Sequence, residues 1–215
     1  MSIISVMSMW VDDKVVDWQP LRSDAWLATS RWGKQEVAKQ LYFDTSLAKI
    51  ATRLLGLLIK NRSVVVLCIG SDRLVGDSLG PLCGQYLKYH FDTPCFVYGC
   101  LANPINALNL ADTLQYINIR HKKSLVIAID SMIGHMDTVG KCKLIYGGIS
   151  PGSADGKRLP MCGDLSLTAI IADCKMPPYL NHNIRLGNIN HLAYTLASIV
   201  NGAVQSQMVA TIKNG

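Results

Sequence analysis

The chain has 215 residues, of which 49% are hydrophobic and 17% charged, and its formal net charge is +6. This composition indicates a well-packed globular body, and the positive charge is too small and too diffuse to indicate a nucleic-acid binder. No apolar run reaches the roughly 18 residues that a membrane span requires, and the amino terminus lacks the basic flank of a secretory signal. We therefore expect a cytoplasmic protein with neither a membrane nor a nucleic-acid partner.

The cysteine content also indicates a cytoplasmic protein. Seven are present, an odd number, and no two of them form a CxxC pair. Cys95 and Cys100 are five residues apart and have no matching second pair, which does not suit a structural zinc site. We expect no cofactor.

The first 40 residues differ from the rest of the chain. All four tryptophans fall here, at Trp10, Trp18, Trp26 and Trp32. Indoles in a short segment favour an extension that packs on the surface of the body. An arm that binds a partner or forms a homo-oligomer is the alternative. Residues 41–215 are expected to form a single domain.

From residue 44 onward, helical and strand patterns alternate. Asp44 and Thr45 are suitable caps for the first helix. Helices are predicted at 45–60, 81–91, 106–120 and 188–204, and strands at 64–70, 95–100, 124–134, 139–146 and 165–172. A glycine- and proline-rich loop is predicted at 147–160. This alternation indicates an α/β protein with a mostly parallel sheet between helices.

Two of the predicted strands lead to acidic residues. The buried run VVVLCIG at 64–70 is followed by a glycine-punctuated loop that carries Asp77, and SLVIAIDSMIG at 124–134 has Asp130 at its carboxyl end. Because ligands collect outside the carboxyl ends of neighbouring parallel strands, we expect both aspartates to face one crevice. Taken singly, each could be only a helix cap or an Asx turn. As a close pair they would share a proton, so that one activates a water and the other protonates a leaving group.

Other chemistries match the sequence less well. The loop at 70–80 lacks the residues of a P-loop and the spacing of GxGxxG, and no GxSxG occurs. His135, five residues after Asp130, leaves a metal site as a minor alternative. Asp72 is expected to support the pair. Lys157, Arg158 and Asp164 are expected to form a third wall of the crevice, although the two bases would suit a solvated surface loop equally.

Four segments in order carry a resemblance to a known family. They are CIGSDRLVGDSLGP, VYGCLANPINALNL, VIAIDSMIG and LPMCGDLSLTAII. Over about residues 41–204 they resemble the YyaC-type spore proteases of endospore-forming bacteria. That family is distantly similar to the germination protease that degrades small acid-soluble spore proteins, and to the hydrogenase maturation endopeptidases. The resemblance implies a three-layer α/β/α sandwich of the phosphorylase/hydrolase-like kind and a location in the forespore or spore core.

The resemblance also implies roles for single residues. The two aspartates proposed as the catalytic pair of the germination protease correspond here to Asp77 in GDSLGP and Asp130 in AIDSM. The maturation endopeptidases place nickel-binding acids at equivalent points and add a histidine on a later loop, but the corresponding segment here, LPMCGDLSL, has no histidine. The resemblance therefore implies an endopeptidase that acts on a protein substrate through two aspartates without a metal. A non-catalytic binding or regulatory protein on the same fold is the alternative.

Overall fold

The computed structural model describes residues 8–11, 14–17, 19–20, 39–59, 62–152, 159–175 and 184–214. Its main sheet has seven strands in the order β3-β4-β8-β9-β7-β5-β6. These strands are β3 (Gln19–Pro20), β4 (Lys39–Phe43), β5 (Val64–Cys68), β6 (Phe96–Tyr98), β7 (Leu125–Gly134), β8 (Cys142–Tyr146) and β9 (Leu165–Asp173). A separate antiparallel ribbon is formed by β1 (Ser8–Val11) and β2 (Lys14–Asp17).

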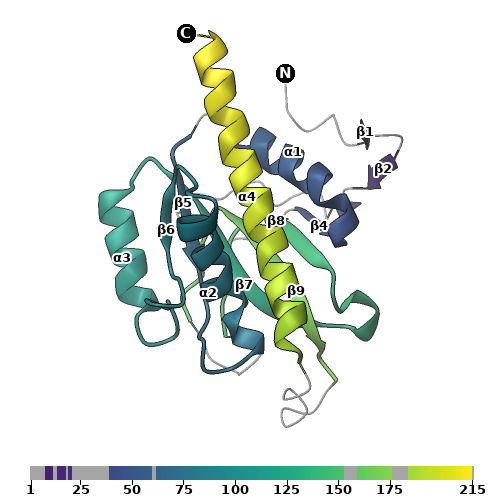
Figure 1. The fold of residues 1–215 in the computed structure, drawn as a ribbon, viewed down its shortest axis with the longest axis vertical. Helices are drawn as coiled ribbons and strands as arrows, with labels where there is room; N and C mark the ends of the chain where they lie inside the picture. The colour runs from purple at the N-terminus through teal and green to yellow at the C-terminus, as the bar shows by residue number, and fades with distance from the viewer. Residues whose placement is uncertain are drawn as a thin grey trace.

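The helices follow the predicted order. They are α1 (Ala48–Ile59), α2 (Leu79–Gln85), α3 (Leu110–Arg120) and α4 (Leu186–Asn214), with 3-10 turns η2 (Thr45–Leu47), η3 (Gly76–Ser78) and η5 (Met136–Thr138) and a π-helical turn η4 (Tyr86–His90). The predicted cap is confirmed at Asp44, whose carboxylate accepts the N–H of Ser46 at 2.9 Å. The long helix α4 crosses one face of the sheet, and its carboxyl-terminal end extends past the body (Figure 1).

The sheet is mixed, with a parallel and an antiparallel half. The pairs β5-β6, β5-β7 and β7-β9 are parallel, as expected. The pairs β3-β4, β4-β8 and β8-β9 are antiparallel, so the expectation of a mostly parallel sheet holds for one half only. Residues 135–141 between β7 and β8 are too few for the crossover of about a dozen residues that parallel strands need, so β8 runs back in the opposite direction.

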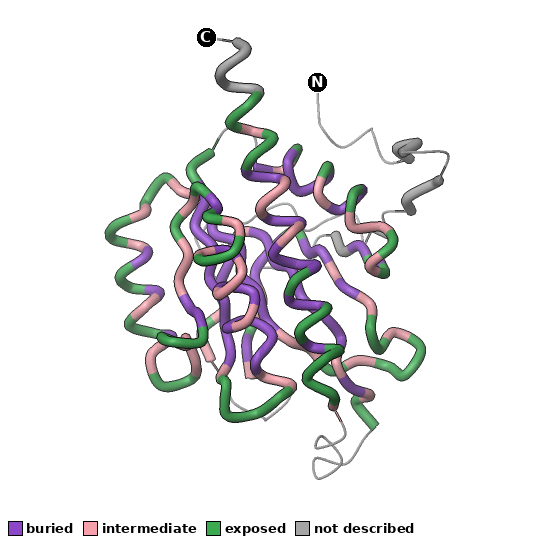
Figure 2. Tube along the Cα trace, viewed as in Figure 1, coloured by how far each residue is buried: buried purple, intermediate pink, exposed green. Residues whose placement is uncertain are grey.

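Helices cover both faces of the sheet, which confirms the three-layer α/β/α class. Val64, Val66 and Cys68 of β5 belong to a core cluster with α1, α2 and α4. Val65 and Leu67 pack with α3 on the other face. The alternation follows from the period of two along a strand, and both helical layers leave β5 wholly buried, as the unbroken apolar run predicts. Figure 2 shows the buried central strands between the more exposed outer helices.

Two strands of the main sheet were not predicted, β3 and β4, and β3 lies within the segment expected to be an extension. β4 begins at Lys39, before the expected domain boundary, and pairs along its length with β8. Trp18, Trp26 and Trp32 lie outside the described residues, as does the side chain of Trp10, so the packing of the tryptophan-rich extension stays a prediction. None of the helices in the described ranges has both the length and the apolar character that crossing a membrane demands.

Candidate active site

Asp130 lies at the point where β7 loses one of its two neighbours. The pairing of β5 with β7 ends at Cys68 opposite Ile129, and the N–H of Ile69 then donates to the carbonyl of Ile129 at 2.8 Å. β7 itself continues to Gly134 beside β9. The strand predicted at 124–134 is confirmed, but Asp130 lies in its middle and not at its carboxyl end, as the sequence had suggested. Asp130 marks the carboxyl end of β5 instead, since it is the first residue of β7 beyond that pairing.

The loop after β5 brings Asp77 back onto the end of the same strand. The N–H of Ser71 donates to the carbonyl of Asp77 at 3.0 Å, and the turn η3 that carries Asp77 contacts β7. Gly70 has φ +140, and a Cβ there would lie 2.0 Å from the carbonyl oxygen of Asp77. A Cβ on Gly80 would lie equally close to the carbonyl oxygen of Ile69. Glycine at both positions lets the backbone of η3 and α2 rest directly on the end of β5.

The two aspartates interact electrostatically. Asp130 is 8% exposed. Burial, followed by the negative charge of Asp77, raises the pKa of Asp130 to about 8, while the Ser131 N–H that donates to its Oδ1 at 2.8 Å acts in the opposite direction. At pH 7 Asp130 is therefore mostly protonated. The neighbouring carboxyl group of Asp77 is half-buried.

Two further residues are close to Asp130 and were not predicted as site residues, Cys162 and Thr168. Cys162 is fully buried, and burial, then the charge of Asp130, hold the pKa of its thiol far above the usual range. Thr168 of β9 lies opposite Asp130 in the register, and its hydroxyl donates to the sulfur of Met132 at 3.1 Å. The sequence signal for Cys162 was its place in LPMCGD, the segment that leads into β9.

Asp164 lies apart from the pair. Its Oδ2 accepts the N–H of Val126 at 2.8 Å, and its own N–H donates to the carbonyl of Val126 at 2.7 Å. These bonds extend the β7-β9 ladder at the amino end of β9. Asp130 is opposite Thr168, four residues further along β9, which is ~13 Å at the usual rise of a strand. Asp164 therefore links β7 to the start of β9.

The remaining predicted residues lie around the site without meeting the pair. Asp72 is exposed on the turn between β5 and η3, and His135 is exposed beyond the end of β7. Lys157 and Arg158 lie outside the described residues. Within the described ranges, no three His, Cys, Asp or Glu side chains are grouped so that they could hold a metal ion. Of the site residues predicted from the sequence and described by the structure, only Asp77 and Asp130 are brought together at the end of β5.

This fold and site define an α/β/α protein with a carboxyl pair at the end of a central strand. Residues 39–199 match the family described as "Protein of unknown function (DUF1256)", and the chain belongs to that family. It is 37% identical over 172 residues to "Uncharacterized protein YyaC" of Bacillus subtilis (strain 168), a match that covers 77% of this chain and 84% of the relative. The resemblance to the YyaC type is therefore confirmed.

A solved structure with some likeness to the fold is that of a [NiFe] hydrogenase maturation protease, HycI, from Thermococcus kodakarensis KOD1. The two share 16% sequence identity with a TM-score of 0.37, over 68% of this chain and 97% of the other. At this level the likeness says nothing about the activity of the present chain.

Proposed function

We propose that the protein is an endopeptidase that uses Asp77 and Asp130 to hydrolyse peptide bonds of a protein substrate. The observation that carries the proposal is the raised pKa of buried Asp130, to about 8, with the charge of Asp77 as its second cause. A carboxyl that keeps its proton near pH 7 can act as a general acid, and a neighbouring carboxylate can act as a general base.

The pair would share the work of one hydrolysis. Asp77, on the more accessible loop, accepts a proton from water as the water oxygen bonds to the carbonyl carbon. Asp130 gives its proton to the amide nitrogen as the C–N bond breaks. The pair holds one proton before and after turnover, and its transfer back from Asp77 to Asp130 restores the starting state.

The proposal is tested by cleavage assays with paired variants. Purified wild-type protein, Asp77→Asn and Asp130→Asn are incubated with small acid-soluble spore proteins and with unfolded casein, and the products are identified by mass spectrometry. Each variant is expected to lose at least about a hundredfold in rate, the scale of a lost acid or base. Asp137→Asn, at an exposed position in η5, is the matched control and should cleave normally.

Two results would count against this activity. Cleavage that persists in both aspartate variants would remove the pair from the chemistry, provided that circular dichroism shows all proteins folded. Activity that is lost on treatment with EDTA and restored by a divalent cation would favour the metal-dependent alternative. The small acid-soluble spore proteins are chosen because the YyaC type resembles spore proteases, and a forespore location belongs to the same proposal.

A binding or regulatory protein is the second candidate. One observation favours it: Oδ1 of Asp130 accepts the N–H of the next residue, Ser131, at 2.8 Å, so this carboxyl already has a structural hydrogen bond within its own strand. In that case the wild-type protein would bind the spore protein without cleaving it at any pH from 5 to 9, and Asp130→Asn would bind it equally well.

A further inference from the structure

Within the described residues, the stretch of β7 beyond Asp130 lacks a neighbouring strand on the side where β5 lies. Ser131 to Gly134 pair with β9 on one side. On the other side β5 has already ended, because Gly70 turns the chain away and its N–H donates to the carbonyl of Ile105. Within the described residues, β7 therefore has one strand neighbour here and two over its first half. This open edge of β7 begins immediately beside Asp130.

The register shows which backbone groups face this edge. The backbone groups of odd-numbered residues of β7 bond toward β5. The N–H of Leu125 donates to the carbonyl of Ser63, and the carbonyl of Ile129 accepts the N–H of Ile69. Even-numbered residues bond toward β9, from Val126 at one end to Gly134, whose carbonyl accepts the N–H of Cys174 at 2.6 Å. A bulge interrupts the β7–β9 pairing after Met132, but its extra residue, Ile171, belongs to β9. The alternation of odd- and even-numbered residues along β7 therefore continues to Gly134.

Ser131 and Ile133 consequently face the position that β5 has vacated. The N–H of Ser131 is bonded to Asp130. The carbonyl of Ser131 and both backbone groups of Ile133 are bonded to no other residue in the described part of the chain. Such a row of groups, repeating every two residues, is the template on which an extended polypeptide adds as a strand.

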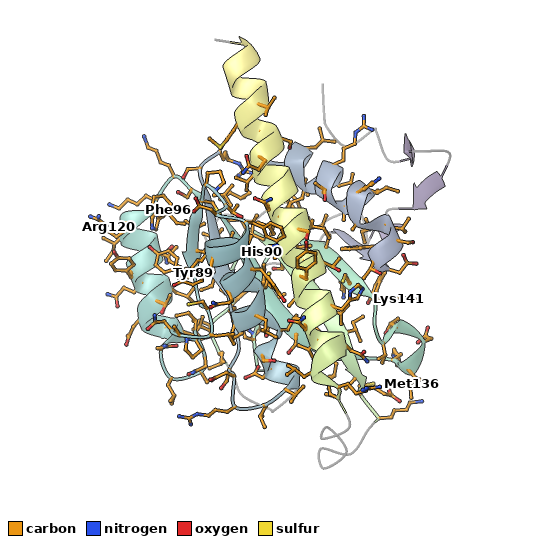
Figure 3. The ribbon with its side chains drawn as sticks, viewed as in Figure 1. Tyr89, His90, Phe96, Arg120, Met136 and Lys141 are labelled. Carbon is orange, nitrogen blue, oxygen red and sulfur yellow. The ribbon has the colours of Figure 1, made fainter. Side chains whose placement is uncertain are left out.

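Segments near the end of β5 carry exposed apolar side chains: the loop before η3, the segment after Ile105, whose carbonyl accepts the N–H of Gly70, and the start of α4, a helix that contacts η3. Leu74 is 63% exposed on the loop before η3, Leu108 is 89% exposed on the segment after β6, and Leu186 is 56% exposed at the start of α4. Ile133 on the edge itself is 37% exposed. Figure 3 shows Met136, which is also exposed, at the end of the molecule toward which β7 and β9 run, whereas Phe96 lies near the opposite end of the sheet. The surface around the edge suits apolar side chains.

We infer that the open edge of β7 binds an extended, apolar stretch of the substrate polypeptide as an added strand. The backbone of that stretch bonds to Ser131 and Ile133, and its side chains contact the exposed side chain of Ile133 and that of Leu74 on the loop before η3. A peptide bond of the added strand next to Ser131 then lies beside Asp130. This inference rests on the proposed peptidase function and specifies its substrate as an unfolded or loosely folded segment, because a folded strand or helix has no free backbone groups to pair.

The test uses short fluorescein-labelled peptides rich in leucine and valine, with the Asp77→Asn protein to prevent cleavage. Binding is measured by fluorescence anisotropy. Peptides N-methylated at alternate residues are compared with peptides methylated at the intervening residues. A β-strand forms hydrogen bonds to a given neighbour through every second residue, and N-methylation removes the N–H that donates. Methylating the residues that face β7 should therefore weaken binding at least about tenfold, while methylating the intervening residues should be tolerated.

A pair of protein variants locates the contact. Ile133→Asp should weaken peptide binding at least about tenfold, because a charge on the edge opposes strand addition. Val139→Asp, at a residue equally exposed at 37% but outside the edge, is the matched control and should bind normally. Equal loss from both methylation patterns, or equal binding by both variants, would overturn the inference, as would a homodimer that forms through this edge and is lost in Ile133→Asp.

The outcomes also separate the inference from the proposed function. Aspartate-dependent cleavage without any effect of methylation pattern would retain the peptidase and reject strand addition. If binding depends on which alternate residues are methylated but the wild-type protein cleaves no peptide, the strand-addition inference stands and the peptidase proposal is rejected.

Discussion

Asp130 is the residue whose environment differs most from that of an ordinary carboxyl group. Its pKa is raised from 3.8 to about 8 in the folded protein. Between these values the folded state holds a proton that the unfolded state has lost. The contribution of Asp130 to the free energy of unfolding is therefore fully present below about pH 4 and declines toward pH 8, by up to ~1.4 kcal/mol per pH unit.

The first prediction is that Asp130→Asn removes this pH dependence. Asparagine does not ionise, so the free energy of unfolding of the variant, relative to that of the wild type, should rise between pH 4 and pH 8. Urea unfolding of both proteins at several pH values measures the difference. If the two curves stay parallel, Asp130 has an ordinary pKa and is no candidate for a general acid.

A second prediction separates the two causes of the shift. Asp77→Asn removes the negative charge but leaves the burial of Asp130 unchanged, and burial is the larger cause. The pKa of Asp130 should therefore fall below its wild-type value and remain above 4. Carbon-13 NMR titration of the Asp130 carboxyl measures it directly. An unchanged pKa would mean that the aspartates do not interact.

At the scale of the elements, the glycines of the β5-α2 connection hold the two aspartates together. Gly80→Ala would place its Cβ 2.0 Å from the carbonyl oxygen of Ile69, so the start of α2 must move and Asp77 with it. We predict a loss of ~1–3 kcal/mol in the free energy of unfolding, as for other overpacked sites, together with reduced cleavage. Gly187→Ala is the matched control, since no atom lies within 4 Å of the added Cβ.

The two variants are compared by urea unfolding and by the cleavage assay. Gly187→Ala lies in the first turn of α4 and should leave the protein unchanged or stabilise it by up to ~1 kcal/mol, because alanine is the better helix former. If Gly80→Ala changes neither the free energy of unfolding nor the cleavage rate, the close approach of α2 to β5 does not position Asp77.

The elements also show how far the sequence could be interpreted. β5 and α1 were predictable because an unbroken apolar run and a helical apolar spacing are each local patterns. β4 was missed: only five residues long, it depends for its register on β8, about a hundred residues further along the chain. The extent of β7 was predicted, but the sequence placed Asp130 at its carboxyl end because the apolar run is interrupted there; the pairing of residues 131–134 with β9 is what continues the strand.

The same reasoning applies to the candidate site. Asp77 and Asp130 were predictable as neighbours because the carboxyl ends of parallel strands converge. Asp164 looked similar in sequence, an aspartate after a glycine before a strand, yet its carboxylate bonds to Val126. That partner lies 38 residues earlier in the chain, and no local pattern indicates the contact.

At the scale of the whole molecule, the carboxyl pair and the closest helix packing lie in different places. α1 and α4 approach each other through two glycines: a Cβ on Gly202 would lie 2.9 Å from Cγ2 of Thr52, and one on Gly56 would lie 3.3 Å from Oγ of Ser206. Gln207 joins the helices further by donating to the carbonyl of Gly56 at 2.9 Å. Asp77 and Asp130 lie at the carboxyl end of β5, outside this contact.

Stability and turnover should therefore separate in Gly202→Leu. The larger side chain forces the two helices apart, and we expect the free energy of unfolding to fall by ~1–3 kcal/mol, the usual range for overpacking. Because the carboxyl pair is untouched, the cleavage rate per folded molecule should match the wild type well below the melting temperature. Scanning calorimetry and the cleavage assay measure the two quantities. A variant that stays folded but loses activity would show that the packing of α1 on α4 controls the geometry at the end of β5.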